Sequence, residues 1–286
     1  MIGAIAGDLI GSEYEFHNIA NEDFGPLFSK KSVYTDDTVL TIATADVILN
    51  NGSYAVEFYK YARSHPNRGW GGGFDAMVKT GKLEPYNSYG NGAIMRVSPV
   101  GWMYPDIEST LAEAKKSAEC THNNREGIKG AQAIASAMYW GRCGSGRVDI
   151  MEQVAKLGYD LSRLPHDFRQ GQFDVTCQGT IPRVMSVFAA TNDFESGMRK
   201  MVAMGGDVDT NCCAYGAIAE AFYGLPDGIK EEVYIRLPRD MANIVTAFYK
   251  KYIDENFEEP NVKVGSMTAT FEDQLSSLFS MGSGTI

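Results

Sequence analysis

The chain has 286 residues, of which 44% are hydrophobic, and it carries a formal net charge of −10. This hydrophobic content supports a sizeable buried core, although length alone does not decide between one large domain and two small ones. The negative charge argues against a broad nucleic-acid surface, which needs a basic footprint, but it leaves room for a small anionic ligand held locally.

Cysteine and histidine spacing excludes the common zinc and disulfide patterns. The five cysteines form no C-x-x-C pair and are odd in number, and the four histidines show no H-x-x-x-H spacing. The N-terminal segment lacks basic residues and contains an acid at Asp8, so we predict no signal peptide. Without an apolar run of about 18 residues, we expect a cytoplasmic protein with no membrane contact.

Helical periodicity dominates the chain. Apolar spacing predicts helices over 2–10, 36–48, 54–63, 74–78, 107–118, 128–138, 147–157, 182–191, 193–204, 209–222 and 239–255. Thr35 is the expected N-cap of the second helix, and Pro182 is expected at the first position of its own helix.

Extended structure is indicated only over 261–271, where apolar residues alternate. We find no internal repeat, linker or break in composition. The sequence therefore predicts an all-α fold, a single compact multi-helix domain over 1–286, with a disordered tail at 281–286.

Two of the predicted helices begin with acidic motifs. Thr35-Asp36-Asp37 opens one, and Asp207-Val208-Asp209-Thr210 opens the other after two glycines. In isolation each is an ordinary helix start, because Asp and Thr cap helices and match the dipole. If the motifs converge, however, their carboxylates repel one another unless cations lie between them. Oxygen ligands of this kind suit Mg²⁺, Mn²⁺ or Ca²⁺ rather than zinc.

Two glycine-rich segments, 68–74 and 88–93, each lead into a short helical pattern. They are similar to helix N-termini that bind anions, and equally to ordinary turns between helices. Neither is a G-x-G-x-x-G following a strand, so a dinucleotide-binding Rossmann site is not indicated.

A series of motifs in a fixed order resembles the ADP-ribosylglycohydrolases, a family that includes the dinitrogenase-reductase-activating glycohydrolases and vertebrate ADP-ribosyl-acceptor hydrolases. The motifs are GDLIGSEYE (7–15), YTDDT (34–38), GWGGG (69–73), SYGNGAIMR (88–96), THNNREGIKGA (121–131) and GGDVDT (205–210). The resemblance covers about 2–225. Two departures are Val208 in place of a small polar residue, and Asn211-Cys212-Cys213 in place of apolar and small ones.

The resemblance implies an orthogonal all-α domain with a binuclear Mg²⁺ centre, in some members Mn²⁺. Carried over to this sequence, the implied metal ligands are Thr35, Asp36, Asp37, Asp207, Asp209 and Thr210. Glu15 is implied as a mobile acid that touches metal or water. The implied substrate-binding residues are Gly71, Gly72, Gly73, Ser88, Tyr89, Gly90, Asn91, Gly92 and His122, with Tyr89 stacking on the ligand and Asn91 as a polar anchor.

The function implied is metal-dependent hydrolysis of the glycosidic bond between ADP-ribose and its acceptor, either a protein side chain or a small molecule. The general base is Glu15, Asp36 or Asp37, and the sequence does not choose among them. The SYGNG and GWGGG segments look closer to the branch acting on O-linked ADP-ribose than to the arginine-specific branch. Neither the acceptor nor the oligomeric state follows from the sequence.

Two other readings stay open. One is a catalytically silent ADP-ribose-binding protein on the same fold, although every implied metal-ligand position holds an acid or a hydroxyl. The other is a haloacid-dehalogenase-type phosphatase, because Asp207-x-Asp209 resembles its nucleophile pair. That fold requires an apolar strand before the motif, whereas 198–204 follows helical spacing.

Overall fold

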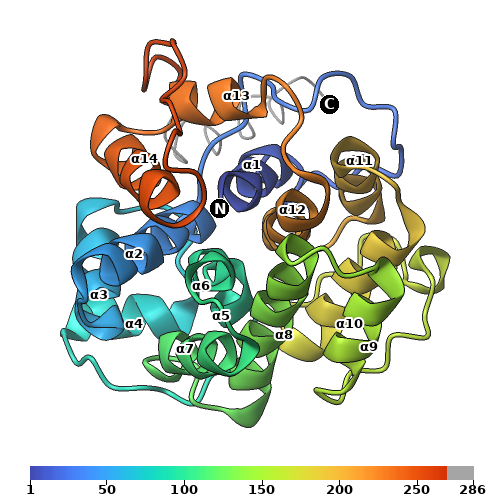
Figure 1. The fold of residues 1–286 in the computed structure, drawn as a ribbon, viewed down its shortest axis with the longest axis horizontal. Helices are drawn as coiled ribbons and strands as arrows, with labels where there is room; N and C mark the ends of the chain where they lie inside the picture. The colour runs from blue at the N-terminus through green and yellow to red at the C-terminus, as the bar shows by residue number, and fades with distance from the viewer. Residues whose placement is uncertain (269–286) are drawn as a thin grey trace, which may run out of the picture.

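The structure is a computed structural model that describes residues 1–268, and it is built from helices joined by turns and loops (Figure 1). The helices are α1 Ile2–Gly11, α2 Asp36–Asn50, α3 Tyr54–Ser64, α4 Gly72–Thr80, α5 Gly92–Met95, α6 Ser98–Met103, α7 Ile107–Glu119, α8 Arg125–Arg142, α9 Arg147–Ala155, the 3-10 turn η1 Pro165–Asp167, α10 Cys177–Ala190, α11 Phe194–Met204, α12 Val208–Tyr223, α13 Ile229–Arg236 and α14 Arg239–Tyr252. Within the described part, the only extended pairing is an isolated bridge between Gly90 and Thr176. The predicted all-α class is confirmed.

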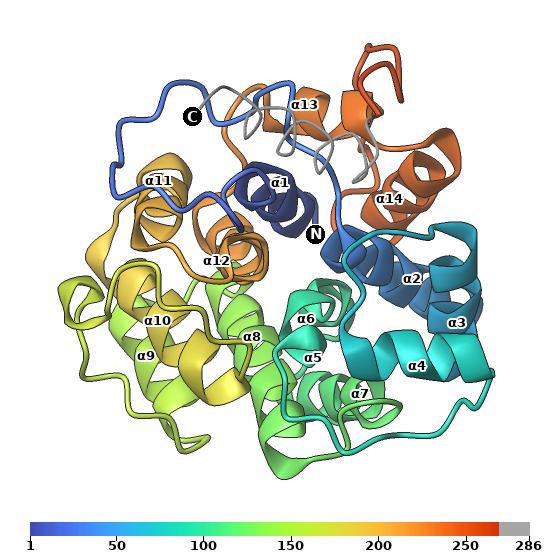
Figure 2. The ribbon, with the colours of Figure 1, turned by 180° about the vertical axis from the view of Figure 1, so that it is seen from behind.

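Two helices that are far apart in the sequence, α1 and α12, lie side by side at the centre in both views (Figures 1 and 2). Their backbones touch because α1 presents a glycine every fourth residue. A Cβ at Gly3 would lie 2.4 Å from the Gly216 carbonyl oxygen, one at Gly7 2.0 Å from that of Cys212, and one at Gly11 2.5 Å from that of Val208. This close contact brings Asp8 of α1 and Asp209 of α12 near each other.

The remaining helices surround this pair. Helices α2 and α13 pack on α1, while α8, α10 and α11 pack on α12 (Figure 2). One connected cluster of buried hydrophobic side chains runs from Met1 to Phe257. The central helices are thus enclosed on most sides, which explains why all ten residues of α1 are buried.

Helix α10 begins five residues earlier than predicted, so placing Pro182 at its first position was wrong. The Thr176 side chain caps the helix by accepting a hydrogen bond from the Gly179 N–H at 3.1 Å, and Pro182 lies inside it. A proline in that position costs one backbone hydrogen bond, which the cap and the buried face of α10 outweigh.

The extended segment predicted from residue 261 was also wrong as far as the structure describes it. Residues 261–268 form bends and turns, in which Met267 N–H donates to the Ile235 carbonyl at 2.9 Å. The rest of that segment and the predicted disordered tail at 281–286 lie outside the described residues. The short helical pattern expected after 88–93 is α5. Helices α6 and α13 were not predicted, because each is too short to show a clear helical period.

Two further findings bear on function. Nowhere in residues 1–268 is there a helix whose length and hydropathy suit the crossing of a bilayer. Helix α11 directly precedes Asp207, and the described chain contains no strand there, so the phosphatase reading lacks the fold it requires.

Candidate active site

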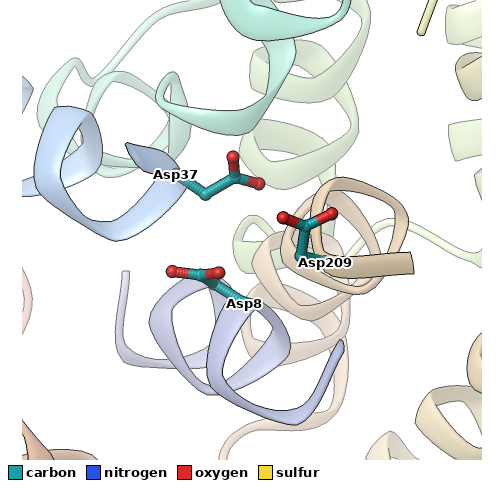
Figure 3. A group of neighbouring side chains, drawn as sticks. All are labelled: Asp8, Asp37 and Asp209. Carbon is teal, nitrogen blue, oxygen red and sulfur yellow. The ribbon is translucent and has the colours of Figure 1, made fainter. Parts of the chain in front are cut away.

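Acidic side chains from three helices converge at the N-terminal end of α12. Asp8 of α1, Asp37 of α2 and Asp209 of α12 point toward one another (Figure 3), with an oxygen of each within 4.8 Å of the others. Glu15, Asp207 and Asp209 form a second group at the same spacing. Since Asp209 belongs to both, the two groups make one continuous acidic cluster.

Asp8 is the member of this cluster that sequence reasoning missed. Its fully buried carboxylate accepts hydrogen bonds from the Thr35 N–H (2.9 Å) and hydroxyl (2.7 Å), and from the Thr38 N–H (3.1 Å) and hydroxyl. It therefore ties the start of α2 to α1. A single acid within a helix of small and apolar residues was the signal that could have found it.

The start of α2 presents its two acids differently. Asp37 is buried, and its Oδ1 lies 3.5 Å from the Thr210 hydroxyl. Its Oδ2 is buried and has no hydrogen-bond partner. Asp36 is held by its N–H, which donates to the Arg68 carbonyl at 2.8 Å, and its carboxylate belongs to neither three-acid group. Thr35 is the N-cap, as predicted.

The second acidic motif is held by polar contacts from two loops. Asn91 donates its amide protons to Asp207 Oδ2 at 2.6 Å and to the Thr180 hydroxyl at 3.1 Å. Asn18 accepts from the Gly206 N–H and donates to the Glu15 carbonyl at 3.0 Å, which brings Glu15 beside Asp207. The Asn91 amide, which we expect to anchor a ligand, thus also holds an acid of the cluster in place.

One cavity of about 630 Å³ joins the acidic cluster to the glycine loops. Every predicted site residue except Tyr89 lines it: Glu15, Thr35, Asp36, Asp37, Gly71, Gly72, Gly73, Ser88, Gly90, Asn91, Gly92, His122, Asp207, Asp209 and Thr210. Tyr89 is 55% exposed and lies outside the lining. Unpredicted lining residues include Phe16, Trp70, Tyr86, Arg96 and Phe173.

Two glycines in the cavity wall, Gly73 and Gly92, let an aromatic ring and an imidazole ring pack against the backbone. A Cβ at Gly73 would lie 2.7 Å from the Tyr86 ring, and a Cβ at Gly92 would lie 3.1 Å from His122 Nε2. Larger residues there would displace the aromatic and imidazole rings from the cavity wall.

Crowding of the carboxylates shifts their protonation equilibria. Burial, reinforced by the charge of Asp209, raises the pKa of Asp36 and Asp37 well above the usual range. Burial raises the pKa of Asp209 likewise, with Asp207 as the next cause. For the same reasons the pKa of Glu15 is raised to about 10 and that of Asp8 to about 7. Without a cation, the cluster therefore favours holding protons.

The donor set fits hard divalent cations. The ion pairs of the described chain include none of these carboxylates. Carboxylate and hydroxyl oxygens are the ligands that Mg²⁺ and Mn²⁺ take in proteins, and the unpartnered Asp37 Oδ2 is available to one. Cysteine is absent from the cavity lining, and its one histidine, His122, belongs to neither acidic group, which disfavours zinc.

The chain is similar in sequence to several known ADP-ribosyl hydrolases. Human ADP-ribosylhydrolase ARH3 is 24% identical over 309 aligned positions, covering 79% of this chain and 84% of the relative. The ADP-ribosyl-[dinitrogen reductase] glycohydrolase of Rhodospirillum rubrum is 25% identical, with coverage of 86% and 92%. ADP-ribosylarginine hydrolase Tri1 of Pseudomonas putida is 22% identical, with coverage of 79% and 70%.

A solved structure and a family model point to the same group of proteins as these relatives. A chain from a solved ADP-ribosylglycohydrolase-related protein complex superposes with a TM-score of 0.69 at 22% identity, covering 87% of this chain and 96% of that one. The ADP-ribosylglycohydrolase family model matches residues 1–256, beyond the 2–225 over which the motifs carry the resemblance. On this evidence the chain belongs to the ADP-ribosylglycohydrolase family.

Proposed function

We propose that this protein is a metal-dependent hydrolase that cleaves the glycosidic bond between ADP-ribose and an acceptor, a protein side chain or a small molecule. The observation that carries the proposal is the acidic cluster, all of whose members except Asp8 line the same cavity as the two glycine loops. Family membership supports cleavage of ADP-ribose linkages.

In this proposal Thr35, Asp36, Asp37, Asp207, Asp209 and Thr210 hold two Mg²⁺ or Mn²⁺ ions. When bound, such ions supply Lewis acidity, orient sugar hydroxyls and lower the pKa of water. Asp8 adds a further function, because it accepts a hydrogen bond from the Thr35 hydroxyl. The Thr35 oxygen also accepts from the Asp37 N–H, which leaves one lone pair for a cation.

The reaction exchanges one bond at the anomeric carbon of the distal ribose. The bond to the acceptor breaks, a bond to a water oxygen forms, and the transition state has oxocarbenium character. A carboxylate oxygen of Glu15, Asp36 or Asp37 takes the proton that the water loses and passes it on to the departing acceptor, so the acceptor leaves protonated and the carboxylate is regenerated. Glu15 is suited to this task because it is half-buried beside Asp207 and Asp209.

The glycine loops are proposed to hold the rest of the ligand. Helix α4 begins at Gly72, so the backbone N–H groups of its first turn are available to the diphosphate. In the second loop the N–H groups of Gly90 and Asn91 already donate to Ser88 Oγ and to the Val175 carbonyl, so we assign this loop contact with the adenosine end instead. Tyr89 has an exposed ring that is free to stack on a bound base.

Release of free ADP-ribose from a small panel tests this proposal. The panel contains ADP-ribosyl-arginine, ADP-ribosyl-serine and O-acetyl-ADP-ribose, each with Mg²⁺ and with EDTA. We expect EDTA-sensitive release, faster from the O-linked members because the loop motifs resemble that branch. The isosteric Asp207→Asn variant should be inactive on every member.

Stoichiometric binding of ADP-ribose without release from any panel member would instead support a silent binder. Full activity in EDTA would contradict the metal assignment and leave the glycosidic reaction standing. The two outcomes therefore test separate parts of the proposal.

A further inference from the structure

Arg96 is a buried positive charge that the proposed reaction does not use. It follows α5, its side chain is 1% exposed, and it lines the cavity. No carboxylate of the described chain pairs with it. Instead its guanidinium stacks 4.4 Å from the Phe58 ring centre, and Nη2 donates to the Ser117 carbonyl at 3.2 Å and to the Thr121 hydroxyl at 2.7 Å. Burying a charge in this way is costly, so a function is expected of it.

The Thr121 hydroxyl connects Arg96 to His122. Its oxygen lies 2.7 Å from Nδ1 of the His122 imidazole. A guanidinium only donates, so the Thr121 oxygen accepts from Arg96 and keeps its own proton to donate. The Tyr86 phenol also interacts with the Thr121 hydroxyl and is the alternative acceptor of that proton. We assign the Thr121 proton to Nδ1 of His122, which then accepts at 2.7 Å.

An imidazole that accepts at Nδ1 in its neutral form carries its proton on Nε2. That nitrogen faces the second glycine loop, 3.1 Å from a Cβ built on Gly92 and 3.7 Å from one built on Gly90. His122 is 5% exposed and lines the cavity. The glycines leave the Nε2 edge of the ring uncovered on the cavity side.

We infer that Arg96 and Thr121 are positioning residues that fix His122 as the neutral Nε2–H tautomer, so that this N–H donates to an oxygen of the bound ligand. The ligand, ADP-ribose, rests on the proposed function, whereas the tautomer does not. Burial and the charge of Arg96 lower the pKa of His122 well below its usual value, which is consistent with a neutral ring.

Nitrogen NMR of the imidazole side chains tests the tautomer without ligand. Protein labelled with ¹⁵N-histidine gives signals from the four histidines, and the His122→Gln variant assigns that of His122. We expect Nε2 protonated and Nδ1 unprotonated at neutral pH. Protonated Nδ1, with Thr121 donating to Tyr86 instead, would overturn the inference.

A pair of variants at Thr121 tests the hydrogen-bond relay that runs from Arg96 through Thr121 to His122. Thr121→Val keeps the side-chain shape but removes the hydroxyl, whereas Thr121→Ser keeps the hydroxyl. We expect Thr121→Val to lose the Nε2–H preference and to bind ADP-ribose about tenfold more weakly by calorimetry, as for one lost hydrogen bond. Thr121→Ser should match the wild type in both measurements, and Mg²⁺ affinity should be the same in all three.

A Thr121→Val protein with wild-type tautomer and affinity would overturn the relay. If that variant fails to fold, the wild-type spectrum decides the tautomer by itself. Failure of the wild-type chain to bind ADP-ribose would refute the proposed function, and the ligand-free spectrum would still test the positioning of His122.

Discussion

Asp8 accepts four hydrogen bonds from Thr35 and Thr38, although no motif analysis singled it out as a functional residue. An acid in a helix of small residues costs free energy unless it is satisfied. Here the backbone and hydroxyl groups at the start of α2 satisfy it, so the acid joins two helices and orients a proposed ligand of the metal.

Replacing Asp8 by Asn should weaken this junction. The Asn side chain offers one acceptor oxygen and adds donors, so several buried N–H and O–H groups lose their partner. With Mg²⁺ in excess we expect a loss of about 3 kcal/mol in the free energy of unfolding, measured by urea titration. Thr38→Val removes only one of the donors and should cost about 1 kcal/mol. Equal effects of the two variants would contradict a central role for Asp8.

Asp209 is the carboxylate shared by both acidic groups. Asp209→Asn keeps the shape and removes the charge, so we expect Mg²⁺ affinity by calorimetry and release of ADP-ribose each to fall about 100-fold or more. Asp227→Asn, at an exposed position in the loop before α13, serves as the matched control. Wild-type Mg²⁺ affinity in Asp209→Asn would remove Asp209 from the metal site.

At the scale of elements, the contact between α1 and α12 sets the position of the site. Its glycine stripe lets two backbones touch, which places Asp8 and Asp209 opposite each other. Long helices such as α2 and α8 carry apolar residues over several turns and were predicted. The start of α10 was not, because its Thr176 cap lies in an irregular segment and Pro182 offered a stronger but misleading signal.

Gly7→Ala tests the close approach of these helices. The added methyl group would lie 2.0 Å from the Cys212 carbonyl oxygen, so the helices must separate. We expect a loss of about 3 kcal/mol or more in the free energy of unfolding. Gly72→Ala is the control, because nothing lies within 4 Å of its added Cβ, and its stability should change by less than about 1 kcal/mol. A stable Gly7→Ala protein would show that the stripe is not needed.

At the scale of the whole molecule, part of the acidic charge is buried around the cavity rather than spread over the surface. The chain has a net charge of −10, and several of its carboxylates are buried around one cavity. Since burial raises their pKa values, the folded protein without metal binds more protons than the unfolded chain at a given pH.

Stability without metal should therefore fall as pH rises. The stabilising protons are present below the unfolded pKa of about 4 and are lost as pH passes the folded values, about 7 for Asp8. Each extra proton contributes about 1.4 kcal/mol per pH unit. Melting curves of EDTA-treated protein, with and without added Mg²⁺, should show a Mg²⁺-dependent gain in Tm that grows from pH 5 to 7.5. A gain independent of pH would contradict this account.

The sequence by itself determined the all-α class, most of the helices and the family motifs, because apolar periodicity and short chemical motifs are local properties. All the site residues that it predicted except Tyr89 line the cavity. Only the tertiary structure decided that Asp8 joins the acidic cluster, that Asn91 is bound to Asp207, and that Arg96 reaches His122 through Thr121. The contact between Asn91 and Asp207 joins residues 116 positions apart, and the acidic cluster joins α1, α2 and α12. Such contacts depend on how closely the helices pack, which no local pattern encodes.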